Sequence, residues 1–150
     1  MSGRYFEQFA VGDHFIHEVR RTVTETDNLL FSLVTHNSQP LHLDAEYARA
    51  SEFGRVLVNS CFSFSLMIGL TVGDTTLRTL FANLGFDQVK TPHPVFLGDT
   101  LRAETDIVEV RDSRSRPNVG IVVFAHRLLN QRDETVCECQ RTALIHRTST

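Results

Sequence analysis

The sequence predicts an α+β fold in which an antiparallel sheet packs against one long apolar helix. Residues 60–72, SCFSFSLMIGLTV, leave almost no polar face, which is typical of a buried helix. Residues 80–145 then change to short apolar segments separated by turn residues, as expected for consecutive strands. Strands that follow one apolar helix form a sheet layer against it.

The segments before the long helix predict one strand and one short helix. Residues 14–24 alternate irregularly in polarity, which favours a strand. Residues 25–35 carry apolar side chains at 3.6-residue spacing, which indicates one helix face. That predicted apolar face consists of Leu29, Leu30, Leu33 and Val34.

A proline then forces a turn before the next helix. Pro40 lacks an N–H and its ring clashes with a preceding turn, so it cannot sit inside a regular helix. We expect Leu41 to enter the core and to hold the neighbouring His42 at the surface of a cleft. Asp44 is a predicted N-cap for a helix over residues 45–50.

Four strands are predicted after the long helix, which we expect to end at Gly73 and Asp74. The strand-like segments alternate in polarity or are apolar throughout, and they cover residues 80–89, 101–110, 119–129 and 135–145. Polar residues, glycines or prolines separate them, so short connections and antiparallel neighbours are expected.

The length, the net charge and the composition of the chain restrict the class of protein. A chain of 150 residues favours one domain, residues 1–150, with a single core. The net charge of -3 argues against a nucleic-acid or membrane-surface binder. No apolar run reaches the roughly 18 residues of a membrane span, and residues 1–9 hold no apolar signal core, so we expect a cytoplasmic protein. The three cysteines suggest no disulfide framework, and we interpret them as small core residues.

Residues 31–48, FSLVTHNSQPLHLDAEYA, resemble the signature of the MaoC-like, or (R)-specific enoyl-CoA, hydratases. The string T-x-N-x-x-P-L-H-x-D matches the spacing of the family pattern T-G-D-x-N-P-x-H-x-D. His42 falls on the catalytic His of that pattern, whereas Asn37 stands where the family has its catalytic Asp. Residues 94–101, PVFLGDTL, resemble the strand entry of the family, and residues 56–70 resemble its loop and central helix.

The resemblance implies a hot-dog fold, a homodimer and hydration of an enoyl-CoA thioester. His42 would be the general acid and base, since an imidazole titrates near neutral pH. Asn37 cannot titrate, but an amide can orient a water molecule by donating and accepting hydrogen bonds. The chain resembles most the branch that acts on C5 dicarboxylic acyl-CoAs such as mesaconyl-CoA or itaconyl-CoA. An alternative is a subunit that binds acyl thioesters without catalysis, which would explain Asn37 directly.

The start of the long helix is the second part of the predicted site. Where the family has His-Gly, this chain has Asn59 and Ser60. A free N–H at a helix N-terminus suits a developing enolate oxygen, so the Ser60 N–H is the predicted oxyanion donor. Asn59 would cap the helix, face the substrate, or do both. Pro40 and Cys61 are also expected to border the substrate.

Two further predictions concern CoA and the remaining chemistry. Arg114 and Arg116 could pair with the phosphates of CoA, although a solvated loop is an equal alternative. The scattered histidines match no metal-binding pattern, so we expect neither a metal nor a cofactor. A hot-dog thioesterase is the other alternative. It would need a carboxylate on the central helix, and residues 60–72 have none.

Overall fold

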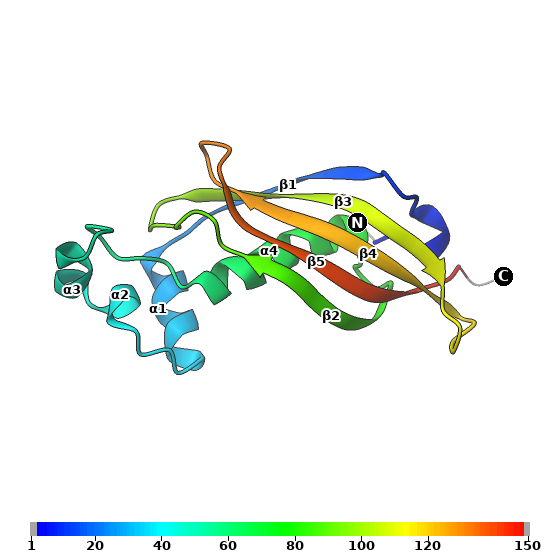
Figure 1. Cartoon of the computed structure of the whole chain (residues 1–150), viewed down its shortest axis with the longest axis horizontal. Coiled ribbons are helices and arrows are strands. Elements are labelled where there is room, and N and C mark those ends of the chain that lie inside the picture. The colour runs from blue at the N-terminus through cyan, green and yellow to red at the C-terminus, as the bar shows by residue number, and fades with distance from the viewer. Residues whose placement is uncertain (1–2, 149–150) are drawn as a thin grey trace.

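The computed structural model describes residues 3–148. One five-stranded antiparallel sheet packs against helix α4 (Ser60–Thr75), which confirms the predicted α+β arrangement (Figure 1). The strands are β1 (His14–Thr22), β2 (Leu80–Lys90), β3 (Thr100–Asp112), β4 (Val119–Leu129) and β5 (Thr135–His146). No helix in this part of the chain is long and apolar enough to cross a membrane.

The strand order in the sheet is β1-β3-β4-β5-β2. β3, β4 and β5 form a meander because short connections place consecutive strands side by side in antiparallel pairs. β1 and β2 take the two edges, so the sheet joins chain segments from both sides of α4. The four strands predicted after the long helix are therefore confirmed.

Three short helices gather at the N-terminal end of α4 (Figure 1): α1 (Glu25–Val34), α2 (Pro40–Leu43) and α3 (Ala45–Ala50). α2 was not predicted, and Pro40 is tolerated there because it occupies the first turn, where its missing N–H would have no partner. The predicted N-cap is confirmed. A carboxylate oxygen of Asp44 accepts the N–H groups of Glu46 and Tyr47 at 2.9 and 3.0 Å.

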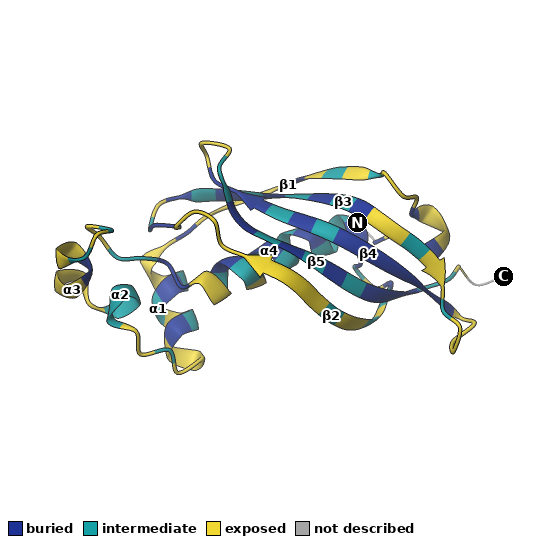
Figure 2. Ribbon diagram, viewed as in Figure 1, coloured by how far each residue is buried: buried dark blue, intermediate teal, exposed yellow. Residues whose placement is uncertain are grey.

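Helix α4 buries one face only. Its buried residues follow helical spacing along the side toward the sheet and are Ser63, Met67, Thr71 and Thr75. Cys61, Ser65 and Gly69 are exposed, as the yellow segments in Figure 2 show for this helix. The prediction of a helix buried all round is wrong for the single chain, because the sheet covers only one side. The predicted end at residues 73 and 74 is also too early, since one glycine costs a helix only about 1 kcal/mol.

The buried face of α1 is polar, which corrects the sequence prediction. Asn28 and Ser32 are 1% and 0% exposed, whereas Leu30, Leu33 and Val34 are all more than half exposed. Periodicity located an apolar face correctly but could not tell which face meets the rest of the chain. Here the polar side is buried because hydrogen bonds to neighbouring segments satisfy it.

The core interpretation of the cysteines is confirmed for two of the three. Cys137 and Cys139 are buried on one face of β5, and burial raises the pKa of Cys137 to about 12 and that of Cys139 to about 11. Both thiols therefore stay protonated at neutral pH. Cys61 is exposed instead, because it lies on the side of α4 that the sheet does not cover.

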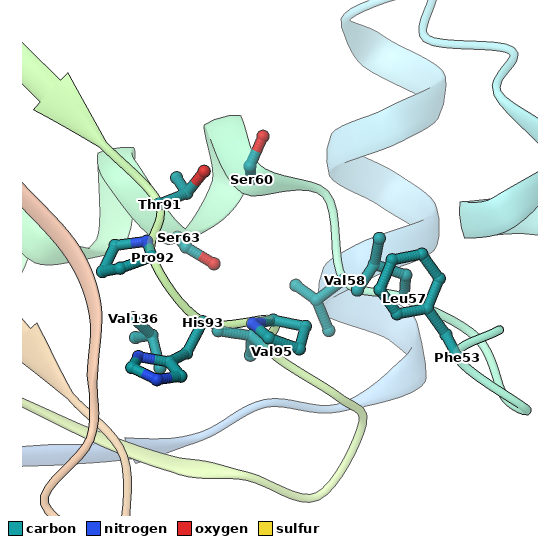
Figure 3. Close-up of a pocket in the computed structure, with 11 residues that line it drawn as sticks. Phe53, Leu57, Val58, Ser60, Ser63, Thr91, Pro92, His93, Val95 and Val136 are labelled. Atoms are coloured by element: carbon teal, nitrogen blue, oxygen red, sulfur yellow. The ribbon is translucent and has the colours of Figure 1, made fainter.

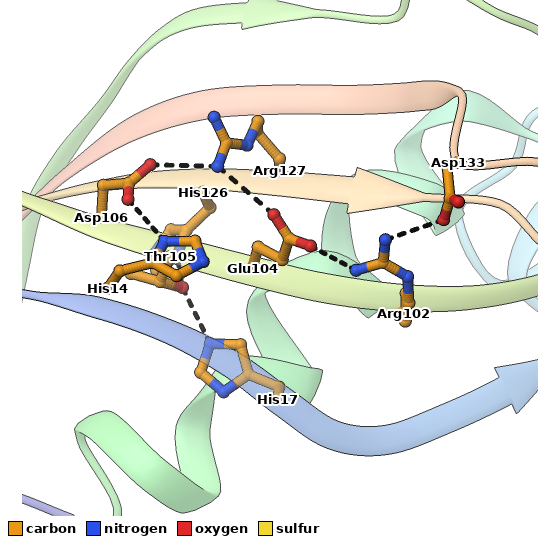
Figure 4. Close-up of polar contacts among 9 residues, drawn as sticks. All are labelled: His14, His17, Arg102, Glu104, Thr105, Asp106, His126, Arg127 and Asp133. Atoms are coloured by element: carbon orange, nitrogen blue, oxygen red, sulfur yellow. Dashed lines mark hydrogen bonds and ion pairs between the residues drawn. The ribbon is translucent and has the colours of Figure 1, made fainter.

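A buried polar chain crosses the sheet near the other end of α4 (Figure 4). His17 Nδ1 contacts Asp74 at 2.8 Å, and His17 Nε2 contacts Thr105 Oγ1 at 2.8 Å. The same hydroxyl contacts His126 Nδ1 at 2.8 Å. Burial, with smaller contributions from the charges of Arg141 and His17, lowers the pKa of His126 to about 3. This histidine is therefore neutral in the folded protein.

The neutral state of His126 predicts acid-dependent stability. The unfolded histidine binds a proton below about pH 6.5, whereas the folded one stays neutral down to about pH 3. Acid therefore favours the unfolded chain between these values. The free energy of unfolding should fall there by up to about 1.4 kcal/mol per pH unit from this residue alone.

Urea denaturation across this pH range checks the prediction against the variant His126→Asn, which keeps a side-chain N–H but does not titrate. The variant should lose less stability than the wild type as the pH falls. Parallel curves for the two proteins would show that His126 does not carry the effect.

Candidate active site

The turn between α1 and α2 fixes the position of Asn37. His36 adopts a left-handed backbone conformation, with φ of 55°, which redirects the chain at the end of α1. The Asn37 N–H donates to the Ser32 carbonyl at 2.9 Å, and Asn37 Oδ1 accepts the Gln39 N–H at 3.1 Å. Within residues 3–148 the Asn37 Nδ2 group has no protein partner, so it is available as a donor to water.

His42 is held in one tautomer. Its Nδ1 lies 2.7 Å from the Leu57 carbonyl oxygen, which can only accept, so Nδ1 carries the proton. Nε2 then bears the free lone pair, and no group in the described part of the chain binds it. The backbone supports this placement because the Leu57 N–H donates to the Leu41 carbonyl at 3.0 Å. Leu41 itself is half-buried. A half-buried imidazole with a free Nε2 can accept and return a proton.

Asn28 joins the two halves of the site and was missed in the sequence. Its Nδ2 donates to the His42 carbonyl at 2.9 Å, and its Oδ1 accepts the Asn59 N–H at 2.9 Å. One buried amide therefore connects the α2 segment to the start of α4. The sequence did contain a signal for a buried polar face on this helix, since Asn28 and Ser32 are polar residues one helical turn apart on α1.

The N-terminus of α4 presents a free donor. Asn59 Oδ1 accepts the Cys61 N–H at 3.0 Å, and Asn59 Nδ2 donates to Ser32 Oγ at 3.2 Å. Asn59 is 1% exposed and is the predicted cap of α4. Among residues 3–148 no group accepts the Ser60 N–H. This donor also lies at the positive end of the dipole of α4.

A cavity of about 290 Å³ opens beside this helix end (Figure 3). Ser60 and Ser63 from α4 line it on one side, and residues 91–95 line it on the other. The remaining wall is apolar and comes from Phe53, Leu57, Val58 and Val136. Leu57 is thus both a wall of the cavity and the residue whose carbonyl holds His42. Ser60 therefore lines the cavity and His42 contacts one of its lining residues, whereas His42, Asn37 and Asn59 are not themselves part of the wall.

Other predicted residues lie outside this cavity. Pro40 is half-buried in α2 and Cys61 is exposed on α4, and neither is part of the cavity wall. Arg114 and Arg116 are exposed between β3 and β4, at the opposite end of the sheet from α2 (Figure 1). Arg116 stacks on the Phe81 ring at 5.0 Å. One chain does not bring these arginines to His42, so their contact with CoA stays a prediction.

The longer α4 also bears on the thioesterase alternative. The helix does contain a carboxylate, Asp74, but fourteen residues of helix place it about 21 Å from Ser60. Asp74 is bonded to His17 there. No carboxylate of α4 therefore lies beside the cavity.

Comparison with known proteins identifies the family. The model of the MaoC like domain matches residues 6–126, which is most of the chain. This chain belongs to the MaoC-like domain family. It is 32% identical over 149 residues to a mesaconyl-CoA hydratase of Cereibacter sphaeroides, covering 99% of this chain and 43% of that protein. It is 30% identical over 146 residues to a beta-methylmalyl-CoA dehydratase of Chloroflexus aurantiacus, covering 97% and 41%. The chain thus spans less than half of these relatives.

Solved structures give the fold its name. A MaoC-like dehydratase from Rhodospirillum rubrum is 30% identical and superposes with a TM-score of 0.86 over 99% of this chain and 100% of that one. A Mycobacterium tuberculosis protein described as having a double hotdog fold is 21% identical, with a TM-score of 0.88 over 97% of this chain and 45% of that one. The predicted hot-dog fold is therefore confirmed for this MaoC-like chain.

Because the Asn28 side chain makes two hydrogen bonds within the site, its removal should strongly lower the free energy of unfolding. Asn28→Ala leaves the His42 carbonyl and the Asn59 N–H without partners, and each unpaired buried group costs about 1–3 kcal/mol. Urea denaturation should show a loss of about 2–4 kcal/mol in the free energy of unfolding. Glu25→Gln, an exposed change on the same helix, should cost less than about 1 kcal/mol. Equal small losses in both variants would contradict the bridging role of Asn28.

Proposed function

We propose that this MaoC-like chain catalyses the reversible addition of water across the 2,3 double bond of an enoyl-CoA thioester. One observation carries the proposal. Ser60, whose N–H has no acceptor among residues 3–148, lines the cavity, and the carbonyl that leaves His42 Nε2 free belongs to Leu57, another lining residue. A base and an oxyanion donor are the two groups that the reaction requires.

The geometry suggests a division of roles. The thioester oxygen would accept the Ser60 N–H, which draws electron density away from C3 of the acyl chain. His42 Nε2 would take a proton from water as the water oxygen bonds to C3, and the electron pair of the double bond would pass to the thioester oxygen as an enolate. Proton return to C2 then completes hydration, and dehydration runs the same steps backwards. No cofactor is required, because the thioester itself acidifies the C2–H.

Asn37 would orient the water. Its Oδ1 is already occupied by the Gln39 N–H, so its remaining group is the Nδ2 donor. A donor can hold the water oxygen while His42 removes a proton from it. The aspartate of the family pattern could also share the proton transfer, so we expect Asn37 to position water without titrating.

The substrate we propose is a branched C5 dicarboxylic acyl-CoA, with mesaconyl-CoA first. The names of the two curated relatives support this choice, since both concern C5 acyl-CoAs of this kind. We also retain the expectation that the protein acts in the cytoplasm.

We further propose that two copies of the chain associate. β2 is an edge strand of the sheet, and it exposes several large apolar side chains: Phe81, Leu84, Phe86 and Val89. The uncovered side of α4 lies next to it, and Phe64 of α4 contacts the Phe86 ring at 5.2 Å. A second copy would cover both features.

The hydratase proposal predicts that His42→Ala abolishes turnover. Removing a general base slows a reaction typically by about 10²–10⁴-fold. The measurement is loss of the enoyl-thioester absorbance with crotonyl-CoA and mesaconyl-CoA. In the same assay Asn37→Ala should be slower than wild type. Asn37→Asp should stay active, because a carboxylate still accepts the Gln39 N–H.

Controls separate the alternatives. His14→Gln removes an exposed histidine that pairs with Asp106 on β3, and it should leave turnover unchanged. Thiol release without hydration would support a thioesterase. Thioester binding without either reaction would support a non-catalytic binding subunit, and would explain the amide at position 37.

The association proposal predicts a dimer in solution. At micromolar concentrations sedimentation should give about twice the chain mass of 17.0 kDa. Leu84→Lys places a charge on the β2 edge and should shift the protein to monomer. Val11→Lys is a matched control, since Val11 is also an exposed apolar residue but lies before β1. A wild-type monomer would overturn the proposal.

A further inference from the structure

Ser63 is an unexplained polar group inside the cavity. Its residue is 2% exposed, and its Oγ has no hydrogen-bond partner in the structure. Figure 3 shows the hydroxyl projecting from α4 into the space between the helix and residues 91–95. A buried hydroxyl without a partner costs about 1–3 kcal/mol. A ligand that hydrogen-bonds the Ser63 hydroxyl would remove this cost.

Most of the cavity wall around Ser63 is apolar. Val58, Val95, Val136 and two prolines supply it, and none of the lining residues is an aspartate, glutamate, lysine or arginine. Besides the two serines, the polar lining residues are Thr91 and His93, and both are exposed. His93 Nδ1 lies 2.9 Å from the Thr135 carbonyl oxygen and therefore carries a proton.

The spacing of the two serines indicates which part of the substrate meets Ser63. Ser63 follows Ser60 by three residues, which is about 4.5 Å along a helix axis. If the thioester oxygen accepts the Ser60 N–H, an acyl chain that continues into the cavity brings its distal end toward the Ser63 hydroxyl. In a four-carbon unsaturated diacid backbone, the distal end holds the second carboxyl group.

We infer that Ser63 is a specificity residue that hydrogen-bonds a carboxylate at C4 of the acyl group from inside the cavity. This inference rests on the proposed function and names a residue that would select its substrate. A methyl group at C4 would leave the Ser63 hydroxyl unpaired. The site therefore favours mesaconyl-CoA over crotonyl-CoA.

The test compares the ratio of kcat/KM for mesaconyl-CoA to that for crotonyl-CoA in wild type and variants. Ser63→Ala should lower the ratio about 10–100-fold, the effect of losing a hydrogen bond to a charged group. The kcat/KM of Ser63→Ala for crotonyl-CoA should stay at the wild-type value or rise. Ser63→Thr keeps the hydroxyl and should restore most of the ratio, and Ser65→Ala, an exposed serine on the same helix, should leave it unchanged.

The outcomes separate this inference from the hydratase proposal. An unchanged ratio in Ser63→Ala, or an equal loss for both substrates, would overturn the role of Ser63 while hydration stands. If the wild type hydrates neither thioester, the hydratase proposal fails. Dissociation constants of the two thioesters then decide the inference. Weaker binding of mesaconyl-CoA alone in Ser63→Ala supports it, and no such difference overturns it.

Discussion

The arrangement of the site depends on one buried amide. Asn28 donates from its Nδ2 to the His42 carbonyl and accepts the Asn59 N–H at its Oδ1, so a single side chain on α1 joins the two segments that hold the predicted base and oxyanion donor. Both bonded groups are backbone atoms, which fixes the path of the chain. The Leu57 carbonyl then sets the tautomer of His42. Disturbing the amide would therefore affect the base and the oxyanion donor together.

The two ends of α4 have different surroundings, and a helix leaves free N–H groups at its N-terminus and free carbonyl groups at its C-terminus. The N-terminal end keeps the Ser60 N–H free beside a cavity, where a helix dipole favours developing negative charge. Near the C-terminal end, Asp74 is bonded to His17 in a buried polar chain that runs on through Thr105 to His126. Burial holds the pKa of His126 far below its ordinary value, so that ring is neutral in the folded protein.

The uncovered surfaces follow from the length of the chain. A single sheet can cover one side of α4 and must leave two edge strands, and this chain exposes apolar side chains on β2 as a result. The curated relatives are more than twice as long as the stretch they share with this chain. Association of two copies would bury the same surfaces without a longer chain.

The sequence by itself determined the five strands, helices α1, α3 and α4 and their order, the cap at Asp44 and the motif around His42. These depend on local periodicity, turn residues and spacing, which are properties of neighbouring residues. Only the tertiary structure decided which face of α1 is buried, that Asn59 points inward and that Ser63 lines a cavity without a partner. Those outcomes depend on contacts between segments far apart in the chain. A polar residue such as Asn28 has no recognisable role until the backbone groups it satisfies have been brought to it.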